Sequence, residues 1–155
     1  MSAPVPRPPR GIVYALERFA ALPTGRRGIA LEAVVTLGVA RILIFTVPVR
    51  WIVRRLDRQP AVTASTSPAA DQLAREVGWA VRAAASKTPW QSACLAQAIA
   101  GKWMLGRRGI RSTIRLGVAK DAEGKLQAHA WLCADALVLT GGERLTRFTP
   151  LGDLD

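Results

Sequence analysis

Residues 94–133 read CLAQAIAGKWMLGRRGIRSTIRLGVAKDAEGKLQAHAWLC and contain the clearest change of periodicity in the chain. Up to Leu105 the apolar residues recur at helical spacing, and the following RRG supplies a basic last turn and a glycine stop. Beyond it, apolar and polar residues alternate over 113–118 and 126–133, with the turn sequence DAEG between the two runs. A third run over 136–140 ends at a glycine pair. The pattern predicts a helix followed by an antiparallel meander.

The start of this helix decides the environment of Cys94. The sequence from Thr88 to Gln91 fits a capping box with proline in the first helical position, whereas Ser92 can also serve as the cap. With Ser92 as the cap, Cys94 lies in the first turn, where the helix dipole and free backbone amides favour a thiolate. With Thr88 as the cap, Cys94 lies one turn deeper and gains less.

The chain before this helix divides by composition. Residues 1–10 hold four prolines and two arginines and predict a flexible arm. Helical spacing predicts a short helix at the start of a helical region over 11–58, and the small-residue sequence QPAVTASTSP predicts a linker, assigned to 59–70. An amphipathic helix from Asp71 to Ala85 then opens the second domain, 71–155, which carries the candidate chemistry.

The most hydrophobic segment runs from Ile29 to Val53. Its uncharged runs are interrupted by Glu32, Arg41 and Pro48, so none reaches the roughly 20 residues that a membrane span requires. We therefore predict a buried or partner-facing helix, with membrane association as the alternative. Four arginines and a tryptophan at its end fit an interfacial anchor or, equally, a solvated helix end. These residues are Arg50, Trp51, Arg54, Arg55 and Arg58.

Composition limits the classes of protein that this chain can belong to. Its 155 residues are 50% apolar, which is enough for the core of one globular domain. Cys94 and Cys133 are too few for a disulfide framework and form no metal-ligand cluster with the single histidine, so we expect a reducing, cytoplasmic setting and no metal. The net charge of +11 is spread along the chain without a nucleic-acid motif, so we expect an acidic partner rather than nucleic acid.

A cysteine near a helix start and a histidine on a strand form the layout of papain-like and transglutaminase-like cysteine enzymes. Cys94 and His129 are the residues in question. By residue type alone the pair is weak evidence, because a cysteine in an alanine-rich helix is more often a small core residue. A histidine beside a tryptophan is likewise often a packing residue.

The residues around this pair are similar to those of the lasso peptide maturation B protein, a transglutaminase-like leader peptidase. The resemblance is dense from Pro89 to about Leu151, and the hydrophobic helix ending in VRW at 49–51 is similar more loosely. The motifs that carry it are PWQSACLAQA at 89–98, LGRRGI at 105–110, LGV at 116–118 and AHAW at 128–131.

The resemblance implies an α+β, papain-like cysteine protease domain in which a catalytic helix packs on an antiparallel sheet, behind a helical N-terminal half. It implies that Cys94 is the nucleophile and His129 the general base. The family's acid would fall at Thr140-Gly141, where this sequence has no carboxylate. Asp135 is the nearest candidate for the third member and Glu143 its alternative, while a backbone carbonyl or an amide can also orient the imidazole.

Three further residues are candidates for lesser roles. Gln91 can donate a hydrogen bond to an oxyanion or cap the helix. Trp131 shares the face of His129 and can line the cleft or pack in the core. Cys133 shares that face too, and we expect it to be a buried thiol.

The implied activity is removal of the leader from a lasso peptide precursor, which frees an α-amine for macrolactam formation. The implied partners are the precursor's leader, a separate leader-recognition protein and an asparagine-synthetase-like cyclase, with residues 11–58 as the docking region and a peripheral membrane contact as a further option. No cofactor is expected in this chain, and ATP dependence through a partner stays open. The alternatives are an acyltransferase or amidase of the same fold and a non-catalytic scaffold.

Overall fold

The computed structural model describes residues 17, 19–48, 51, 67–87, 94–142 and 147–154. Within these ranges the strands form one sheet in the order β3-β2-β1-β4, and every neighbouring pair is antiparallel. The helices are α2 (Thr24–Thr46), α4 (Pro68–Ala85) and α5 (Cys94–Gly106), and the strands are β1 (Thr113–Lys120), β2 (Leu126–Ala134), β3 (Leu137–Thr140) and β4 (Thr149–Leu154). The predicted α+β class is confirmed.

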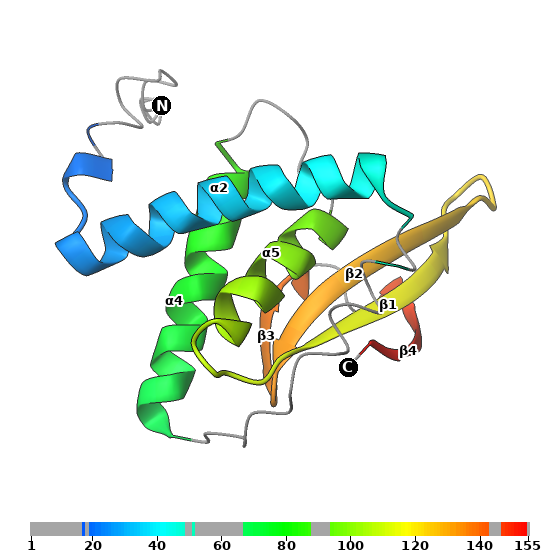
Figure 1. The fold of residues 1–155 in the computed structure, drawn as a ribbon. Coiled ribbons are helices and arrows are strands. Elements are labelled where there is room, and N and C mark those ends of the chain that lie inside the picture. Colours follow the sequence, from blue (N-terminus) through cyan, green and yellow to red (C-terminus); the bar gives the residue numbers. More distant parts are fainter. Residues whose placement is uncertain are drawn as a thin grey trace, which may run out of the picture.

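The elements are arranged in layers (Figure 1). Helices α4 and α5 pack on one face of the sheet, and α2 lies across these two helices. One core joins all three helices to the sheet, because Leu37 of α2, Val81 of α4, Ile99 of α5 and Leu132 of β2 belong to the same buried cluster. The apolar stripe of each helix therefore finds a partner within the chain, and burial of this apolar surface stabilises the arrangement.

The sheet begins as the predicted meander. Strand β1 pairs with β2 from Thr113 opposite Cys133 to Lys120 opposite Leu126. The connecting turn is closed by Asp121, whose Oδ1 accepts hydrogen bonds from the backbone N–H groups of Glu123 and Lys125. An aspartate that bonds its own following backbone in this way is a strong turn former.

Strand β4 was not predicted. It pairs with the outer edge of β1, and the pairing shifts register between Leu116 and Gly117. Its sequence, TPLGDL, contains Pro150 and Gly152, which obscure the alternation that marks a strand. Proline is tolerated there because an edge strand leaves one side of its backbone unpaired.

Helix α4 begins earlier than predicted. Ser67 is its N-cap and accepts a hydrogen bond from the backbone N–H of Ala70 at 3.1 Å, and Pro68 is the first helical residue. Proline fits that position because its fixed φ suits the first turn and its missing N–H would be unpaired there in any case. The predicted start at Asp71 and the linker boundary at residue 70 were therefore wrong.

Helix α2 is displaced towards the N-terminus from the predicted 29–53. It ends at Thr46, two residues before Pro48, because the residue before a proline is disfavoured in helical conformation. The part of the chain that the structure describes contains one helix long and apolar enough to cross a membrane by length and composition, and α2 is that helix. Residues 1–16 and 52–66 lie outside the described residues. The predicted arm, most of the short helix predicted after it and most of the linker therefore lie outside them too.

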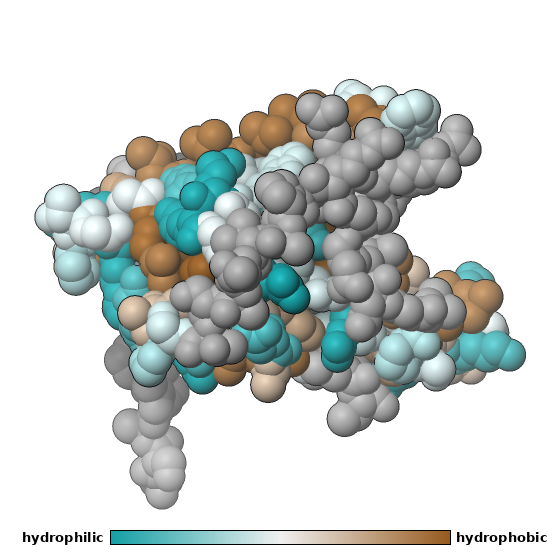
Figure 2. Space-filling view, turned by 60° about the horizontal axis from the view of Figure 1, so that its bottom comes forward, coloured by the Kyte–Doolittle hydropathy of each residue, from teal (hydrophilic) through white to brown (hydrophobic). Residues whose placement is uncertain are grey.

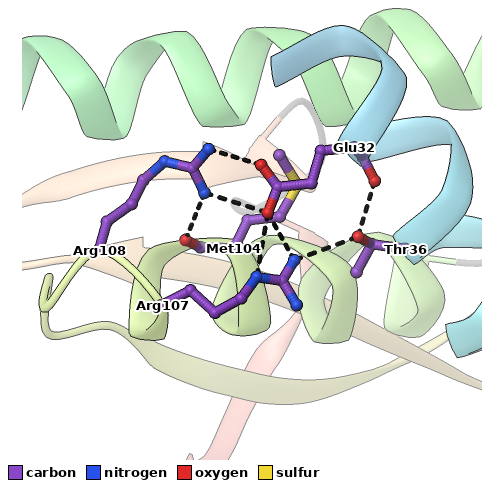
Figure 3. Close-up of polar contacts among 5 residues, drawn as sticks. All are labelled: Glu32, Thr36, Met104, Arg107 and Arg108. Carbon is purple, nitrogen blue, oxygen red and sulfur yellow. Dashed lines mark hydrogen bonds and ion pairs between the residues drawn. The ribbon is translucent and has the colours of Figure 1, made fainter. Parts of the chain in front are cut away.

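A cluster of polar groups fastens α2 to the end of α5 (Figure 3). Arg107 and Arg108 both reach Glu32, with shortest N–O distances of 2.6 Å and 2.5 Å. Thr36, one turn further along α2, accepts a hydrogen bond from Arg107 and donates one to the Glu32 carbonyl. Hydrogen bonding from Arg108 is the largest cause that holds the pKa of Glu32 below its ordinary value of 4.5, against the opposing effect of burial.

Candidate active site

Cys94 is the first residue of α5, and its thiol lies against β2. The sulfur Sγ accepts a hydrogen bond from the backbone N–H of Ala130 at 3.4 Å, and Ala130 directly follows His129. Cys94 is half-buried, whereas Cys133 is buried, as predicted for it. The structure thus brings the helix that carries the candidate nucleophile to the strand that carries the candidate base. Residues 88–93, and with them both candidate caps and Gln91, lie outside the described residues.

Close packing between α5 and β2 fixes where Cys94 lies along the strand. At Gly101, two turns into the helix, a Cβ atom would lie 2.5 Å from Cδ2 of Leu132. Such a separation is far inside van der Waals contact, so the helix reaches this distance only because residue 101 has no side chain.

The Cys94 thiol lies beside a part of β2 that is not paired with β3. The last register pair of β3 is Thr140 opposite Leu132, so at Ala130 the strand has no β3 residue beside it. The backbone N–H of Ala130 is therefore available to the sulfur instead of a strand carbonyl. This backbone donor holds the sulfur in place beside β2.

The imidazole of His129 is held between one polar and two aromatic partners. Its Nε2 lies 2.8 Å from the backbone carbonyl oxygen of Gly141. Its ring stacks on Phe148, with 4.8 Å between ring centroids, and on Trp131, with 6.1 Å. These contacts restrict both the position and the rotation of the ring.

The carbonyl contact determines the proton positions on the ring. A carbonyl oxygen can only accept a hydrogen bond, so Nε2 must carry the hydrogen. In the neutral imidazole Nδ1 then has the free lone pair and is the basic nitrogen. The contact with Gly141 therefore leaves Nδ1 as the ring nitrogen that can accept a proton.

Residue 141 is a glycine for two geometric reasons. Its φ of +75° is in the left-handed region, and a Cβ there would lie 2.6 Å from the carbonyl oxygen of Ala130. The chain thus turns tightly against β2 at this point and presents the residue 141 carbonyl to His129. The family resemblance places the catalytic acid at Thr140-Gly141, where this sequence has no carboxylate. In the structure, the backbone oxygen of Gly141 contacts the imidazole instead.

Asp135 is in a different part of the molecule. It is exposed, with a φ of +48°, in the turn between β2 and β3. His129 and Ala134 are separated by five residues of extended strand, or about 16 Å at the usual rise, so the geometry does not bring Asp135 to the imidazole. Glu143 lies outside the described residues.

Two residues of this site escaped the sequence reasoning. Phe148 stacks on the imidazole but follows a segment with no clear periodicity, and Gly141 acts through its backbone. For Gly141, the one hint in the sequence is the glycine pair at 141–142, which by itself indicates only the end of a strand. Trp131 is buried, and its ring lies over Gly117 on β1, where a Cβ would be 2.9 Å from the ring.

Comparison with known proteins identifies the family. Residues 43–153 match the Transglutaminase-like superfamily domain, which covers more than two thirds of the chain. The chain belongs to the transglutaminase-like superfamily. No curated protein and no solved structure gives a significant match.

The superfamily domain starts inside α2 and ends in β4, so it contains α4, α5 and the whole sheet. Transglutaminase-like domains are typically enzymes of the cysteine protease or acyltransferase type, which agrees with a thiol on a helix held against a strand that carries histidine. Within the described residues, no three histidine, cysteine, aspartate or glutamate side chains lie close enough to hold a metal ion.

Proposed function

We propose that this protein is a cytoplasmic cysteine peptidase that removes the leader from the precursor of a lasso peptide. The observation that carries the proposal is the contact of the Cys94 thiol with the backbone N–H of Ala130, the residue that follows His129, together with the contact of His129 Nε2 with the carbonyl of Gly141. The choice of substrate is supported by the motifs around Cys94 and His129, which are similar to those of the lasso peptide maturation B protein.

In the proposed reaction, Nδ1 of His129 takes the proton of the Cys94 thiol, and the sulfur attacks the scissile carbonyl of the precursor. The tetrahedral intermediate collapses, the imidazolium gives its proton to the leaving amine, and the core peptide departs with a free α-amine. Water, deprotonated by the same imidazole, then hydrolyses the leader thioester. The products are the leader carboxylate and the regenerated thiol.

The oxygen of Gly141 takes the part that a carboxylate plays in a three-residue site. It holds the ring and fixes the tautomer, and its partial negative charge stabilises the imidazolium that forms during the reaction. A neutral carbonyl gives less charge stabilisation than a carboxylate. We therefore expect a functional Cys-His pair with a backbone orienting group.

The partners follow from the substrate. A free α-amine is the nucleophile that an asparagine-synthetase-like cyclase would join to an acidic side chain, and a separate recognition protein would deliver the leader. The reaction as written needs no cofactor or metal in this chain.

The test is cleavage of a lasso precursor peptide encoded beside this gene, with its leader-recognition protein, followed by mass spectrometry. We expect wild-type protein to release the intact leader and the core peptide, and Cys94→Ala and Cys94→Ser to release neither. Cys133→Ala is the matched control, because it removes the other thiol and should cleave normally. Cleavage by Cys94→Ala would refute the proposal.

An added primary amine separates hydrolysis from acyl transfer. If the thioester is handed to an amine instead of water, the leader is recovered as its amide even when the amine is dilute. Recovery of the leader carboxylate under the same conditions supports the peptidase. If wild-type protein cleaves nothing but the complex still requires its presence for cyclisation, the protein is a scaffold and the proposal is wrong.

A further inference from the structure

Helix α2 is apolar on two opposite faces. One face supplies Ala33, Leu37 and Ala40 to the core. The opposite face carries large apolar residues at three- and four-residue spacing, each at least 44% exposed, and Figure 2 shows apolar side chains in a row along the upper edge of the molecule, where α2 lies. These residues, here called the outer face of α2, are Leu31, Val34, Val35, Val39, Ile42 and Phe45.

Arginines border the outer face. Arg27 precedes it, and Arg41 lies along its side with its guanidinium 4.9 Å from the centre of the Phe45 ring, whereas Arg26 is paired with Glu76 of α4. The sole carboxylate of the helix, Glu32, is turned away and held by Arg107 and Arg108. An apolar strip edged by arginines is the pattern of a helix that lies in the interface of an anionic membrane.

Residues that follow α2 extend this pattern in the sequence. The segment VRWIVRRLDR at 49–58 contains four arginines and one aspartate. Trp51 within it is 59% exposed, and tryptophan is enriched where a protein meets the headgroup region.

Two other occupants of the outer face fit less well. A second copy of this chain would bring together two molecules that each carry a net charge of +11. A membrane-spanning α2 would have to leave α4 and α5, with which it shares core residues and the Glu32 cluster. A helix that keeps these contacts can place only its outer face in lipid.

We propose that the outer face of α2 docks this protein on the surface of an anionic lipid bilayer, with the helix parallel to the membrane. The apolar side chains enter the boundary between headgroups and acyl chains, and the arginines contact lipid phosphates. Docking does not depend on the proposed peptidase reaction, because the outer face contains no residue of the Cys94 site.

Flotation with lipid vesicles tests this directly on the full chain. We expect binding to vesicles of phosphatidylcholine mixed with phosphatidylglycerol and much weaker binding to phosphatidylcholine alone. Ile42→Ser and Phe45→Ser should each weaken binding, and together reduce it at least about tenfold. Leu126→Ser is the matched control, because Leu126 at the β1–β2 turn is 72% exposed and Phe45 is 73% exposed. The control should bind like wild type.

Three results would overturn the proposal. The first is wild-type protein that does not float, or that floats equally well with both kinds of vesicle. The second is a dimer, seen by sedimentation at equilibrium without lipid, that Phe45→Ser dissociates, since the outer face is then an interface between copies. The third is protein that stays with cell membranes after high-salt and alkaline washes, which means that α2 spans the bilayer.

Discussion

The edge of β2 beside Cys94 and the outer face of α2 are built on opposite principles. At the edge of β2, a sulfur, an imidazole and two backbone groups are held at distances of 2.8 Å and 3.4 Å by partners that admit little change. The outer face of α2 has no fixed polar partner and depends on area and charge. We therefore expect one substitution at the edge of β2 to remove most of the activity. At the outer face of α2 we expect each substitution to have a small effect and several to add up.

After the loss of cleavage expected for Cys94→Ala, the largest effect that we expect is at His129. His129→Gln should lower the cleavage rate by about 10²–10⁴-fold, because glutamine cannot accept and return the proton. Thermal unfolding should change little, since the ring is only partly buried. Trp131→Phe, which keeps an aromatic ring beside residue 129, is the control and should retain most activity. A rate for His129→Gln within tenfold of wild type would show that the edge of β2 is not the active site.

A smaller but still large effect is expected at Gly141, where Gly124 offers a matched comparison. Both glycines have left-handed φ values, +75° and +77°, but a Cβ at Gly124 meets nothing within 4 Å. Gly124→Ala should therefore cost only the backbone penalty, about 1 kcal/mol of unfolding free energy. Gly141→Ala adds the collision with Ala130 and should cost about 2–4 kcal/mol, as overpacking does.

Activity distinguishes the two glycines further. Displacing the carbonyl of residue 141 frees the imidazole, so Gly141→Ala should lower the cleavage rate even at temperatures where it is folded, and Gly124→Ala should not. Denaturant unfolding and precursor cleavage measure the two effects. Equal losses in both variants would mean that the tight turn against β2 does not matter to the site.

The Glu32 cluster, which keeps α2 on the core, gives a pH-dependent prediction. Glu32→Gln should lower the free energy of unfolding by about 1–2 kcal/mol at neutral pH, because two arginines lose their shared carboxylate. The pKa of Glu32 is lowered in the folded protein, so its contribution is complete above the ordinary value of 4.5 and disappears as pH falls through the folded value.

Urea unfolding of wild type and Glu32→Gln should therefore differ at pH 7 and converge in acid. Glu76→Gln is the control, since Glu76 contacts Arg26 at 3.5 Å and Gln72 at 3.2 Å at the surface and should contribute little at either pH. A difference that is unchanged in acid would show that the Glu32 charge is not what stabilises α2.

The smallest effect is expected at Asp135. Asp135→Asn should leave the cleavage rate within about twofold of wild type and preserve the fold, because asparagine adopts left-handed φ readily. Asp135→Gly controls for the turn itself. A loss close to that of His129→Gln would identify Asp135 as the third catalytic residue and would require β2 and its turn to rearrange on substrate binding.

The parts of the fold and of the candidate site that depend on side chains could be predicted from the sequence, whereas those that depend on backbone groups could not. The change of period after Gly109 predicted α5 and the three-stranded meander correctly, because side chains that alternate across a sheet leave a record in the sequence. The roles of Cys94 and His129 stay a prediction, and the structure places Cys94 against Ala130, the residue that follows His129. The sequence left open that a backbone carbonyl orients the imidazole but could not point to Gly141, because every residue has a carbonyl and tertiary packing decides which one meets the ring.

The errors at the other elements have equally physical causes. The small-residue sequence predicts that Pro68 ends a linker, but proline also starts helices, and the neighbouring Ser67 is the cap of α4. Strand β4 was missed since its proline and glycine hide the alternation. For α2, hydrophobicity predicted a helix but could not show which face the core would cover, because both faces are apolar.

Because α2 is apolar on two opposite faces, the order in which the chain is synthesised also matters. The helix leaves the ribosome before α4 and α5, which supply its inner partners, and at about 5–20 residues per second the next sixty residues take roughly 3–12 s. During that interval the nascent chain exposes both apolar faces of α2. A membrane surface and the unfinished core then compete for the same helix, and the ion pairs of Glu32 cannot yet favour the core, because Arg107 and Arg108 are made after it.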